Sequence, residues 1–439
     1  MKLLLVGQGG REHAIAAALA RSAYHPKLIS YMSSTNPGIA PLSTRILKGS
    51  MKDAAAIAAA AWEEQVDLVV IGPEEPLMHG VIDLLNKKGI PSFGPTQDLA
   101  NLEGNKALLR KFISQAVPEA NPMYKECFTR DEVSQVIRST PSIVVKPLGL
   151  TGGKGVKVSG KQLMNAAEAE AYALEVLEKD GKVLLEEFLD GEEYSQMVFS
   201  DGLHLMPMPL AQDAKYAFEG DKGLMTGGMG SYTQADQLLP FVNKADREKS
   251  FEILKKVIFA AQEEFGQRYH GVLYGQFMLT KEGPKLVETN ARFGDPEAIN
   301  VVSLLRTDPV DVFMGAATML PEAIEFEPAA SVCKYLVPDG YPETKPAPVS
   351  VKITESVLAE ENTRLIYAGA EKSNGYVIAT GSRFAAVLAI RPTVAEAERA
   401  VERTIEKLNL KGVWHRKDVA TTALLKKRVS HMHRVLQGK

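Results

Sequence analysis

Apolar runs alternate with alanine-rich or amphipathic segments over the first hundred residues of the chain. Residues 2–6, 26–30 and 66–72 are short, largely apolar runs, which are typical of buried strands. Residues 11–22 and 53–64 have the composition and spacing of helices. Because strands and helices alternate, we predict a parallel α/β domain here.

From about residue 103 the pattern changes to pairs of strands. The segment "VVKPLGLTGGKGVKV" reads as a hairpin that residues 142–145 enter and residues 155–159 leave. A second hairpin is predicted over residues 193–208, because its Asp201-Gly202 dipeptide favours a tight turn. The other elements predicted in this region are a helix at 105–113, a strand at 182–189 and a strand pair at 271–279 and 284–290.

A last unit contains the proline-rich stretch at residues 337–349. Residues 375–390 alternate like strands, and a helix begins at the capping box Thr393…Glu396. The chain has 439 residues, which at about 150 residues per domain suggests three domains. We therefore predict an α/β protein, α+β in its central part. Its expected domains are a parallel α/β domain at 1–104, a central domain at 105–325 with a glycine-rich flap subdomain at about 123–195, and a small α+β domain at 326–439.

Composition constrains the compartment and the partners. Hydrophobic residues make up 45% of the chain and charged residues 24%, as in ordinary globular proteins. The formal net charge of −3 gives no reason to expect nucleic acid or a membrane as partner. The two cysteines, Cys127 and Cys333, lie far apart in sequence, which favours a reducing compartment. The apolar start breaks at glycines too early for a signal peptide, so we expect a cytoplasmic protein.

The glycine-rich tip of the first hairpin suggests a phosphate cradle, although it is not a P-loop. A P-loop needs a glycine where this chain has Leu148, and a serine or threonine where Gly155 follows Lys154. Backbone N–H groups of such a tip can approach a triphosphate closely because no Cβ intervenes. Protein kinases use a related flap, but their HRD and DFG motifs are missing from the sequence. The alternative interpretation is a mobile surface hairpin that happens to carry lysines.

The segment "VGQGGREHA" joins the first strand to the first helix through glycines. It departs from a dinucleotide-binding fingerprint, because Glu12 stands where the third glycine is needed. A glycine turn before a helix N-terminus, with Arg11 and His13 beside it, suits a single phosphate monoester. The alternative is a tight turn without any ligand.

The segment "KLVETNARFGDPEA" carries the strongest candidate chemistry. Glu288, Asn290 and Arg292 alternate, so on a strand all three side chains would point the same way. Carboxylate and amide oxygens are suitable ligands for Mg²⁺, and Gln276 on the partner strand would supply another. Arg292 would hold a substrate carboxylate or a transferring phosphoryl group. The alternative is the polar face of an ordinary sheet.

Two further loops have the composition of nucleotide or anion sites. "EEFLDGEE" runs from a strand into a turn, so its backbone at 187–189 could read an adenine edge and Glu193 could bind ribose hydroxyls. The alternative for this segment is a solvated acidic turn. "TGGMGS", residues 226–231, is either a glycine nest that lines an anion site or a flexible loop.

Taken in order, these motifs resemble the ATP-grasp superfamily and, within it, the phosphoribosylamine–glycine ligase (glycinamide ribonucleotide synthetase) family. The resemblance runs nearly end to end and includes "GQGGREHA", "GPEEPL", "LEGNKALLRKF", "GLTGGKGV", "TGGMGSY", "GVLYGQFM" and "NARFGDPE". It implies a central ATP-grasp domain and an enzyme of purine biosynthesis. Such an enzyme joins glycine to 5-phosphoribosylamine through a glycyl phosphate, uses ATP with Mg²⁺ or Mn²⁺, and is a monomer or homodimer.

The resemblance also implies roles for individual residues. Lys106 and Lys146 would contact ATP phosphates, and Glu288 and Asn290 would bind the metal with Gln276 as a third ligand. Arg292, Lys146 and Asp213 would be catalytic. The remaining implied residues are, for the nucleotide, Gly152, Gly153, Lys154, Glu186, Glu187, Leu189 and Glu193, and, for the substrates, Gly9, Gly10, Arg11, Glu12, His13, Asn36, Asp213, Lys215, Thr226, Gly227, Gly228, Arg292 and Asp295.

Other functions fit parts of the sequence. Another ATP-grasp ligase would use a different acid, and a biotin-dependent carboxylase is disfavoured because the sequence lacks a biotin-attachment "MKM". A non-catalytic nucleotide-binding regulator would not need both metal ligands and all three lysines. An NAD dehydrogenase is disfavoured by Glu12.

Overall fold

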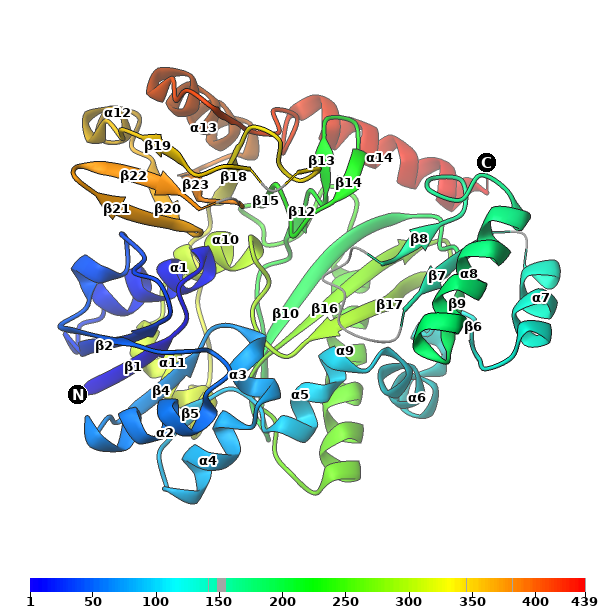
Figure 1. Ribbon diagram of the computed structural model, residues 1–439, viewed down its shortest axis with the longest axis horizontal. Helices are drawn as coiled ribbons and strands as arrows, with labels where there is room; N and C mark the ends of the chain where they lie inside the picture. Colours follow the sequence, from blue (N-terminus) through cyan, green and yellow to red (C-terminus); the bar gives the residue numbers. More distant parts are fainter. Residues whose placement is uncertain (141, 148–154, 345, 381, 439) are drawn as a thin grey trace.

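The computed structural model describes residues 1–140, 142–147, 155–344, 346–380 and 382–438 (Figure 1). Figure 1 shows the strands β10, β16 and β17 in the middle, between the N-terminal sheet and the sheet that contains β7 and β9. The predicted α/β class is confirmed, with a parallel sheet at the N-terminus and antiparallel sheets elsewhere. Within the described ranges, no helix combines the length and the apolar character needed to span a bilayer.

The N-terminal segment forms a five-stranded sheet in the order β3-β2-β1-β4-β5, and every neighbouring pair is parallel. Its strand β1 (Lys2–Val6) is apolar on both sides, because Leu3 and Leu5 pack with one helix layer and Leu4 and Val6 with the other. The three predicted strands and two predicted helices are confirmed, with ends shifted by one or two residues. The other elements are α1 (Gly10–Ala20), β2 (Lys27–Met32), β3 (Arg45–Lys48), α2 (Ala54–Glu63), β4 (Leu68–Ile71), α3 (Glu74–Met78), α4 (Val81–Lys87), β5 (Ser92–Phe93) and α5 (Gln97–Gly104).

A small four-stranded sheet in the order β6-β9-β7-β8 has a core of its own. Its strands β7 (Ile143–Lys146) and β8 (Lys157–Val158) are antiparallel, so the predicted hairpin is confirmed, although β8 is shorter than the predicted strand at 155–159. Val145 and Leu185 pack with helix residues such as Val133 and Ala173. The other elements here are α6 (Lys106–Ala116), β6 (Tyr124–Cys127), α7 (Arg130–Ser139), α8 (Ala166–Asp180) and β9 (Val183–Glu187).

The main antiparallel sheet has the order β11-β10-β16-β17. The second predicted hairpin is confirmed, because β10 (Glu192–Asp201) pairs with β11 (Leu205–Pro207) around Gly202, which has a positive φ of 84°. The predicted strand pair is also confirmed as β16 (His270–Thr280) and β17 (Gly283–Asn290), with a register shift after Gln276. The long helix α9 (Lys244–Phe265) packs on one face of this sheet.

A further sheet joins strands from distant parts of the chain. β12 (Gln212–Asp213) and β15 (Gly230–Thr233) share it with β18 (Ala330–Pro338), β23 (Ala385–Arg391) and β20 (Arg364–Tyr367), so hydrogen bonds cross the predicted boundary at 325. The alternating stretch at 375–390 is divided between two sheets, because β22 (Tyr376–Ala379) pairs with β19 and β21 instead. Thr393 caps its helix by accepting from the Glu396 N–H. The other elements are β13 (Tyr216–Phe218), β14 (Lys222–Met225), α10 (Glu297–Ser303), α11 (Pro309–Ala317), β19 (Val349–Val351), α12 (Glu355–Glu361), β21 (Ala370–Ser373), α13 (Val394–Leu408), β24 (Val413–Trp414) and α14 (Thr422–Gln437).

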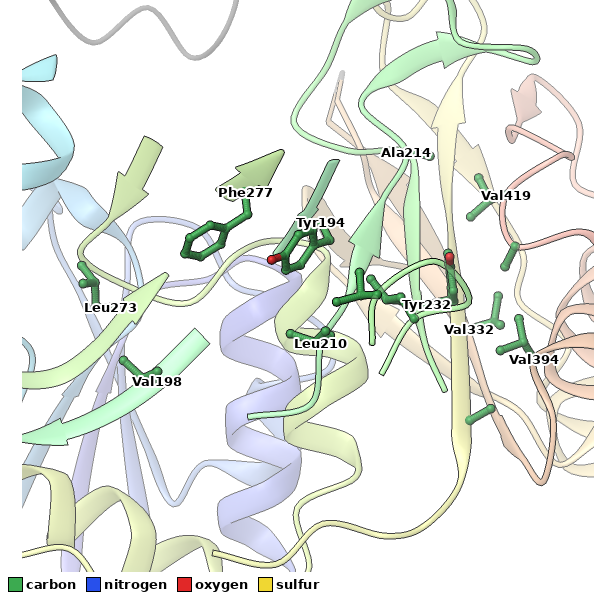
Figure 2. Close-up of a cluster of buried hydrophobic side chains, with 14 of the residues drawn as sticks. Tyr194, Val198, Leu210, Ala214, Tyr232, Leu273, Phe277, Val332, Val394 and Val419 are labelled. Carbon is green, nitrogen blue, oxygen red and sulfur yellow. The ribbon is translucent and has the colours of Figure 1, made fainter. Parts of the chain in front are cut away.

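One hydrophobic cluster connects the main sheet to the C-terminal sheet. Figure 2 shows Tyr194 and Phe277 of the main sheet at one side of this cluster, with Val332 of β18 and Val394 at the other. Leu210, in the segment between β11 and β12, belongs to the same cluster and is drawn below Tyr194. This shared core fixes the main sheet relative to the C-terminal elements and so determines which polar groups meet on the opposite face.

Candidate active site

The main sheet has one apolar and one polar face. Tyr194 and Phe277 stack with ring centroids 5.5 Å apart on the face that α9 covers. Because strand side chains alternate, Glu193 and Gln276 project to the other face. Gln276 is also the direct cross-strand partner of Glu288. The sheet therefore brings a carboxylate from β10, an amide from β16 and a carboxylate from β17 to the same face.

The predicted metal ligands lie around the end of β17. The Glu288 side chain is 45% exposed, and Asn290 ends the strand two residues later. Gln276 is buried; its Oε1 accepts from the Tyr274 hydroxyl, and its Nε2 has no partner among the described residues. No group of three or more His, Cys, Asp or Glu side chains in the described ranges could hold a metal. A cation here would thus use amide oxygens beside the Glu288 carboxylate, and such an all-oxygen set suits Mg²⁺ or Mn²⁺.

Lys215 interacts electrostatically with the carboxylates of this face and with two further carboxylates, Asp213 and Glu297. Its Nζ lies 3.3 Å from Glu193 Oε2 and 4.0 Å from Glu288 Oε1. Burial, reinforced by the Glu297 carboxylate, raises the pKa of Asp213 to about 8. Glu297 Oε1 in turn accepts from the Tyr274 hydroxyl at 2.9 Å. The predicted nucleotide ligand Glu193 and the predicted substrate ligand Lys215 therefore already form an ion pair with each other.

A buried charge cluster lies where the flap sheet meets β17. Both Glu186 oxygens are bound by Arg110, at 2.7 and 3.0 Å, and Lys146 Nζ donates to Oε2 at 2.5 Å. Arg110 also donates to the carbonyls of Leu286 (2.8 Å) and Val287 (2.7 Å) on β17. Burial alone would raise the pKa of Glu186, but Arg110 and Lys146 lower it to about 2. Arg110 thus fixes Lys146 and Glu186 relative to the strand that carries Glu288.

The predicted adenine segment follows directly from this cluster. The Glu186 side chain points into the cluster, and the N–H groups of Glu187 and Phe188 donate to Met123 O (2.9 Å) and Ser142 O (3.1 Å). These bonds leave Leu189, at the end of the segment, as the N–H best placed for a ligand. Lys106 begins α6 one turn before Arg110, and burial lowers its pKa.

The N-terminus of α1 is capped by a side chain of the helix itself. Gly9 is the N-cap and Gly10 the first helical residue; the Gly9 N–H donates to Glu12 Oε2 at 2.5 Å. Glu12 Oε1 accepts from Arg11 Nε at 2.6 Å, and Arg11 Nη1 donates to the Phe293 carbonyl at 2.9 Å. A carboxylate therefore lies at the helix end where the sequence predicts a phosphate, and the Arg11 guanidinium is largely buried.

His13 and Asn36 connect the N-terminal and C-terminal segments. The Tyr367 N–H donates to His13 Nδ1 at 2.8 Å, and the two rings stack. Asn36 Nδ2 donates to Gln8 O and to Tyr367 O, and its Oδ1 accepts from the Gly38 N–H at 2.8 Å. Both side chains are buried, so their observed contacts are between protein segments.

We expect His13 to make folding stability depend on pH. Burial lowers its pKa from about 6.5 to about 4, although the Tyr367 bond opposes the shift. Between these values the unfolded chain binds a proton that the folded chain does not, so stability is complete above pH 6.5 and falls as pH falls toward 4. The loss is at most about 3.5 kcal/mol, since the pKa falls from 6.5 to about 4 and one pKa unit corresponds to about 1.4 kcal/mol. Urea unfolding at stepwise pH should show a shallower acid slope for His13→Gln, whereas exposed His433→Gln should match the wild type; equal slopes for all three would contradict this account.

An arginine from the C-terminal part holds the glycine nest. Arg383 Nη1 donates to the carbonyls of Gly227 (2.5 Å) and Gly228 (2.9 Å), and Nη2 binds Asp295 Oδ2 at 3.0 Å. Thr226 Oγ1 donates to Lys215 O at 2.9 Å and accepts from the Gly228 N–H. These bonds place the predicted substrate residues Thr226, Gly227, Gly228, Lys215 and Asp295 next to one another.

Arg292 does not continue the alternation of Glu288 and Asn290. β17 ends at Asn290, and the Arg292 guanidinium binds Glu103 at 2.8 Å and Glu74 at 3.2 Å. The expectation that all three side chains share one strand face is therefore wrong, because these two carboxylates hold Arg292 toward the N-terminal segment. Three further predicted residues, Gly152, Gly153 and Lys154, lie outside the described ranges.

Sequence reasoning missed several residues that shape the site. Arg110 reads as a polar position of an amphipathic helix, and its partner Glu186 is 76 residues away. Glu297 follows a Pro in "GDPEA" and resembles an ordinary helix start. Arg383 lies in the stretch at 375–390, which was interpreted as alternating strand without assigning a role to its polar residues. For Glu297 alone a sequence signal existed, since it is the next acidic residue after Asp295 in the motif.

Models of three domains of one family match successive parts of the chain. They are the N domain (residues 1–103), the ATP-grasp (A) domain (104–298) and the C domain (331–422) of phosphoribosylglycinamide synthetase. The chain belongs to this family. The glycine nest, the polar sheet face and the Arg110 cluster described above are thus features of a phosphoribosylglycinamide synthetase family member.

Similar proteins span the same length. The phosphoribosylamine–glycine ligase of Methanocella arvoryzae is 44% identical over 98% of this chain and 99% of its own length. That of Pyrococcus furiosus is 43% identical over 98% and 97%. The crystal structure of the Thermotoga maritima phosphoribosylamine–glycine ligase superposes with a TM-score of 0.78 at 26% identity, covering 95% of this chain and all of that one. Biotin carboxylase from Campylobacter jejuni, with a TM-score of 0.72 at 14% identity, shares the fold alone.

Proposed function

We propose that the chain is an ATP-dependent ligase that joins glycine to 5-phosphoribosylamine. The products are glycinamide ribonucleotide, ADP and phosphate, in de novo purine biosynthesis. The observation that carries this proposal is the Arg110 cluster, which joins Lys146 and Glu186 to the strand that carries Glu288. Transfer of a γ-phosphoryl group requires a lysine that is fixed relative to a carboxylate able to bind a metal ion. The family membership of the whole chain supports the choice of substrates.

The reaction has two covalent steps. A glycine carboxylate oxygen attacks the γ-phosphorus of ATP, the bond to the β–γ bridging oxygen breaks, and ADP leaves. The amine nitrogen of phosphoribosylamine then attacks the carbonyl carbon of glycyl phosphate. The C–O bond breaks, phosphate leaves, and the nitrogen loses a proton. Cations that neutralise the transferring phosphoryl group and exclusion of water from the acyl phosphate account for most of the catalysis.

The nucleotide is proposed to lie between the flap sheet and the main sheet. Lys106 and Lys146, with Lys154 on the glycine-rich loop, bind the phosphates. Leu189 and the backbone before it bind adenine, and Glu193 binds ribose. Glu288 and Asn290 would hold Mg²⁺ or Mn²⁺. Gln276 would be a third ligand if its Oε1 released the Tyr274 hydroxyl and bound the cation instead. The bound cation supplies charge neutralisation for the phosphates. Gly152, Gly153, Glu186 and Glu187 complete this site.

The acceptor site is proposed to lie between the N-terminal and C-terminal segments. The sugar phosphate is bound by Arg11 and by the turn at Gly9, Gly10, Glu12 and His13. The phosphate would accept hydrogen bonds that the Gly9 N–H and the Arg11 guanidinium now donate to the Glu12 carboxylate. Arg292 and Asp213 act on the reacting groups. The substrates are positioned by Asn36, Lys215, Thr226, Gly227, Gly228 and Asp295.

We also propose domains at 1–104, 105–325 and 326–439, with a flap subdomain at about 123–195. The protein is proposed to be cytoplasmic and to be a monomer or a homodimer.

A coupled ADP assay tests this function. Phosphoribosylamine, formed in the assay from ribose 5-phosphate and ammonia, is combined with glycine, ATP and Mg²⁺, and each component is omitted in turn. We expect ADP and glycinamide ribonucleotide in equal amounts only in the complete mixture. Replacing glycine by alanine shows which amino acid the enzyme accepts. Removing metal with a chelator and then adding either Mg²⁺ or Mn²⁺ shows which metal ion supports turnover. Full turnover with another amino acid and none with glycine would contradict the proposal.

A further inference from the structure

The C-terminal helix α14 begins at Thr422, the residue at which the last family domain model ends. It packs against β10 and β16 of the main sheet. Figure 1 shows this helix, in red, running from the C-terminal sheet toward the flap. Two of its side chains, Arg428 and His431, reach the start of β10, and His431 also reaches the turn before it.

These two side chains bind carboxylates of the turn, of the start of β10 and of the segment between β13 and β14. Arg428 Nη1 lies 3.1 Å from Glu192 Oε2, and His431 Nδ1 lies 2.7 Å from Glu192 Oε1. His431 Nε2 lies 3.1 Å from Asp190 Oδ1, and Arg428 Nη2 lies 2.7 Å from Asp221 Oδ2. The Glu192 carboxylate is 4% exposed, so both of its oxygens are bound inside the protein by α14.

The turn and the start of β10 are strongly acidic, and Arg428 brings a cation to them. Asp190, Glu192 and Glu193 place three carboxylates within four residues, beside a segment proposed to bind a nucleotide with a negatively charged triphosphate. Glu193 has a separate partner in Lys215. Without α14, the other two carboxylates would repel each other and the triphosphate, and the turn would lose its fixed conformation.

We propose that Arg428 and His431 are positioning residues for the nucleotide. They fix the β9–β10 turn so that Leu189 on one side and Glu193 on the other face the adenosine part of ATP. The inference rests on the proposed function, because that function places adenosine at this turn. It assigns a role in nucleotide affinity to a helix that contains none of the proposed nucleotide ligands.

Binding of a non-hydrolysable ATP analogue to the full-length chain tests this inference. Arg428→Met removes two charged contacts, and His431→Gln removes one ring while keeping a polar side chain. We expect the dissociation constant to rise at least about tenfold for Arg428→Met, since loss of one charge-assisted hydrogen bond corresponds to that factor. The KM for ATP should rise in parallel, while kcat and the KM for glycine stay unchanged. His431→Gln should show the same pattern to a smaller extent.

Arg434→Met and His433→Gln are matched controls, because they change the same residue types at exposed positions of α14. Both should bind the analogue like the wild type. Thermal unfolding shows whether each variant is folded, and His431→Gln carries the test if Arg428→Met does not fold. Unchanged analogue binding by the folded variants, or an equal rise in the KM for glycine, would overturn the inference alone. Wild-type binding of the analogue without ligation would overturn the proposed function alone.

Discussion

Replacing Glu288 with Gln is expected to abolish metal-dependent turnover while leaving the fold intact. The substitution removes the single carboxylate of the proposed ligand set, and the carboxylate is partly exposed, so little packing is lost. A bound metal ion supplies several kcal/mol of charge stabilisation, so loss of the cation corresponds to a loss of at least about a hundredfold in kcat. Lys215, whose Nζ lies 4.0 Å from Glu288, should keep its stronger pairing with Glu193. ADP formation at saturating Mg²⁺ is the measurement.

Glu282→Gln is the matched control for this experiment. Glu282 is an exposed residue in the turn between β16 and β17, and its carboxylate contacts Thr280. The same chemical change at this position should leave turnover within about twofold, since exposed substitutions away from special features have small effects. Turnover of Glu288→Gln close to that of the wild type would remove the metal assignment.

Replacing Arg110 with Met is expected to have the largest effect on stability. Arg110 is almost fully buried, binds both oxygens of Glu186 and donates to two carbonyls of β17. Its removal leaves a buried carboxylate with one cationic partner, which typically costs about 3–5 kcal/mol of folding free energy. Lys146 would then lose its fixed position, so nucleotide affinity should fall as well. Urea unfolding and analogue binding measure the two effects.

Lys111→Met tests whether burial is the cause. Lys111 is the next residue along α6 and pairs with Glu264 at 3.1 Å, but both side chains are about half exposed. An exposed ion pair contributes at most about 1 kcal/mol, so this variant should unfold close to the wild type. Equal losses for Arg110→Met and Lys111→Met would show that the buried cluster has no special role.

Features that depend on neighbouring residues were predictable from the sequence. The run Lys2–Val6 specifies a buried strand by itself, and Asp201-Gly202 specifies a hairpin turn because glycine accepts a positive φ. The cross-strand proximity of Gln276 and Glu288 also followed, since their strands form a predicted pair. These signals are local, and tertiary contacts did not override them.

Features that depend on distant partners were not predictable. The position of Arg292 is set by Glu74 and Glu103, which belong to the N-terminal segment and lie far from it in sequence.

One local feature was also missed: Glu12 caps α1 through a hydrogen bond that spans only three residues. A capping box is usually recognised by Ser or Thr at the N-cap, and Gly9 has no side chain to give that signal.

The transfer of oxygen from glycine to phosphate tests the central claim most directly. Glycine labelled with ¹⁸O in its carboxylate is incubated with the chain, ATP, Mg²⁺ and phosphoribosylamine, and the released phosphate is analysed by mass spectrometry. If a glycyl phosphate forms, the C–O bond breaks in the second step and the phosphate retains an oxygen from glycine. We predict one ¹⁸O atom in each phosphate released with glycinamide ribonucleotide. Unlabelled phosphate at full product formation would contradict the proposed reaction.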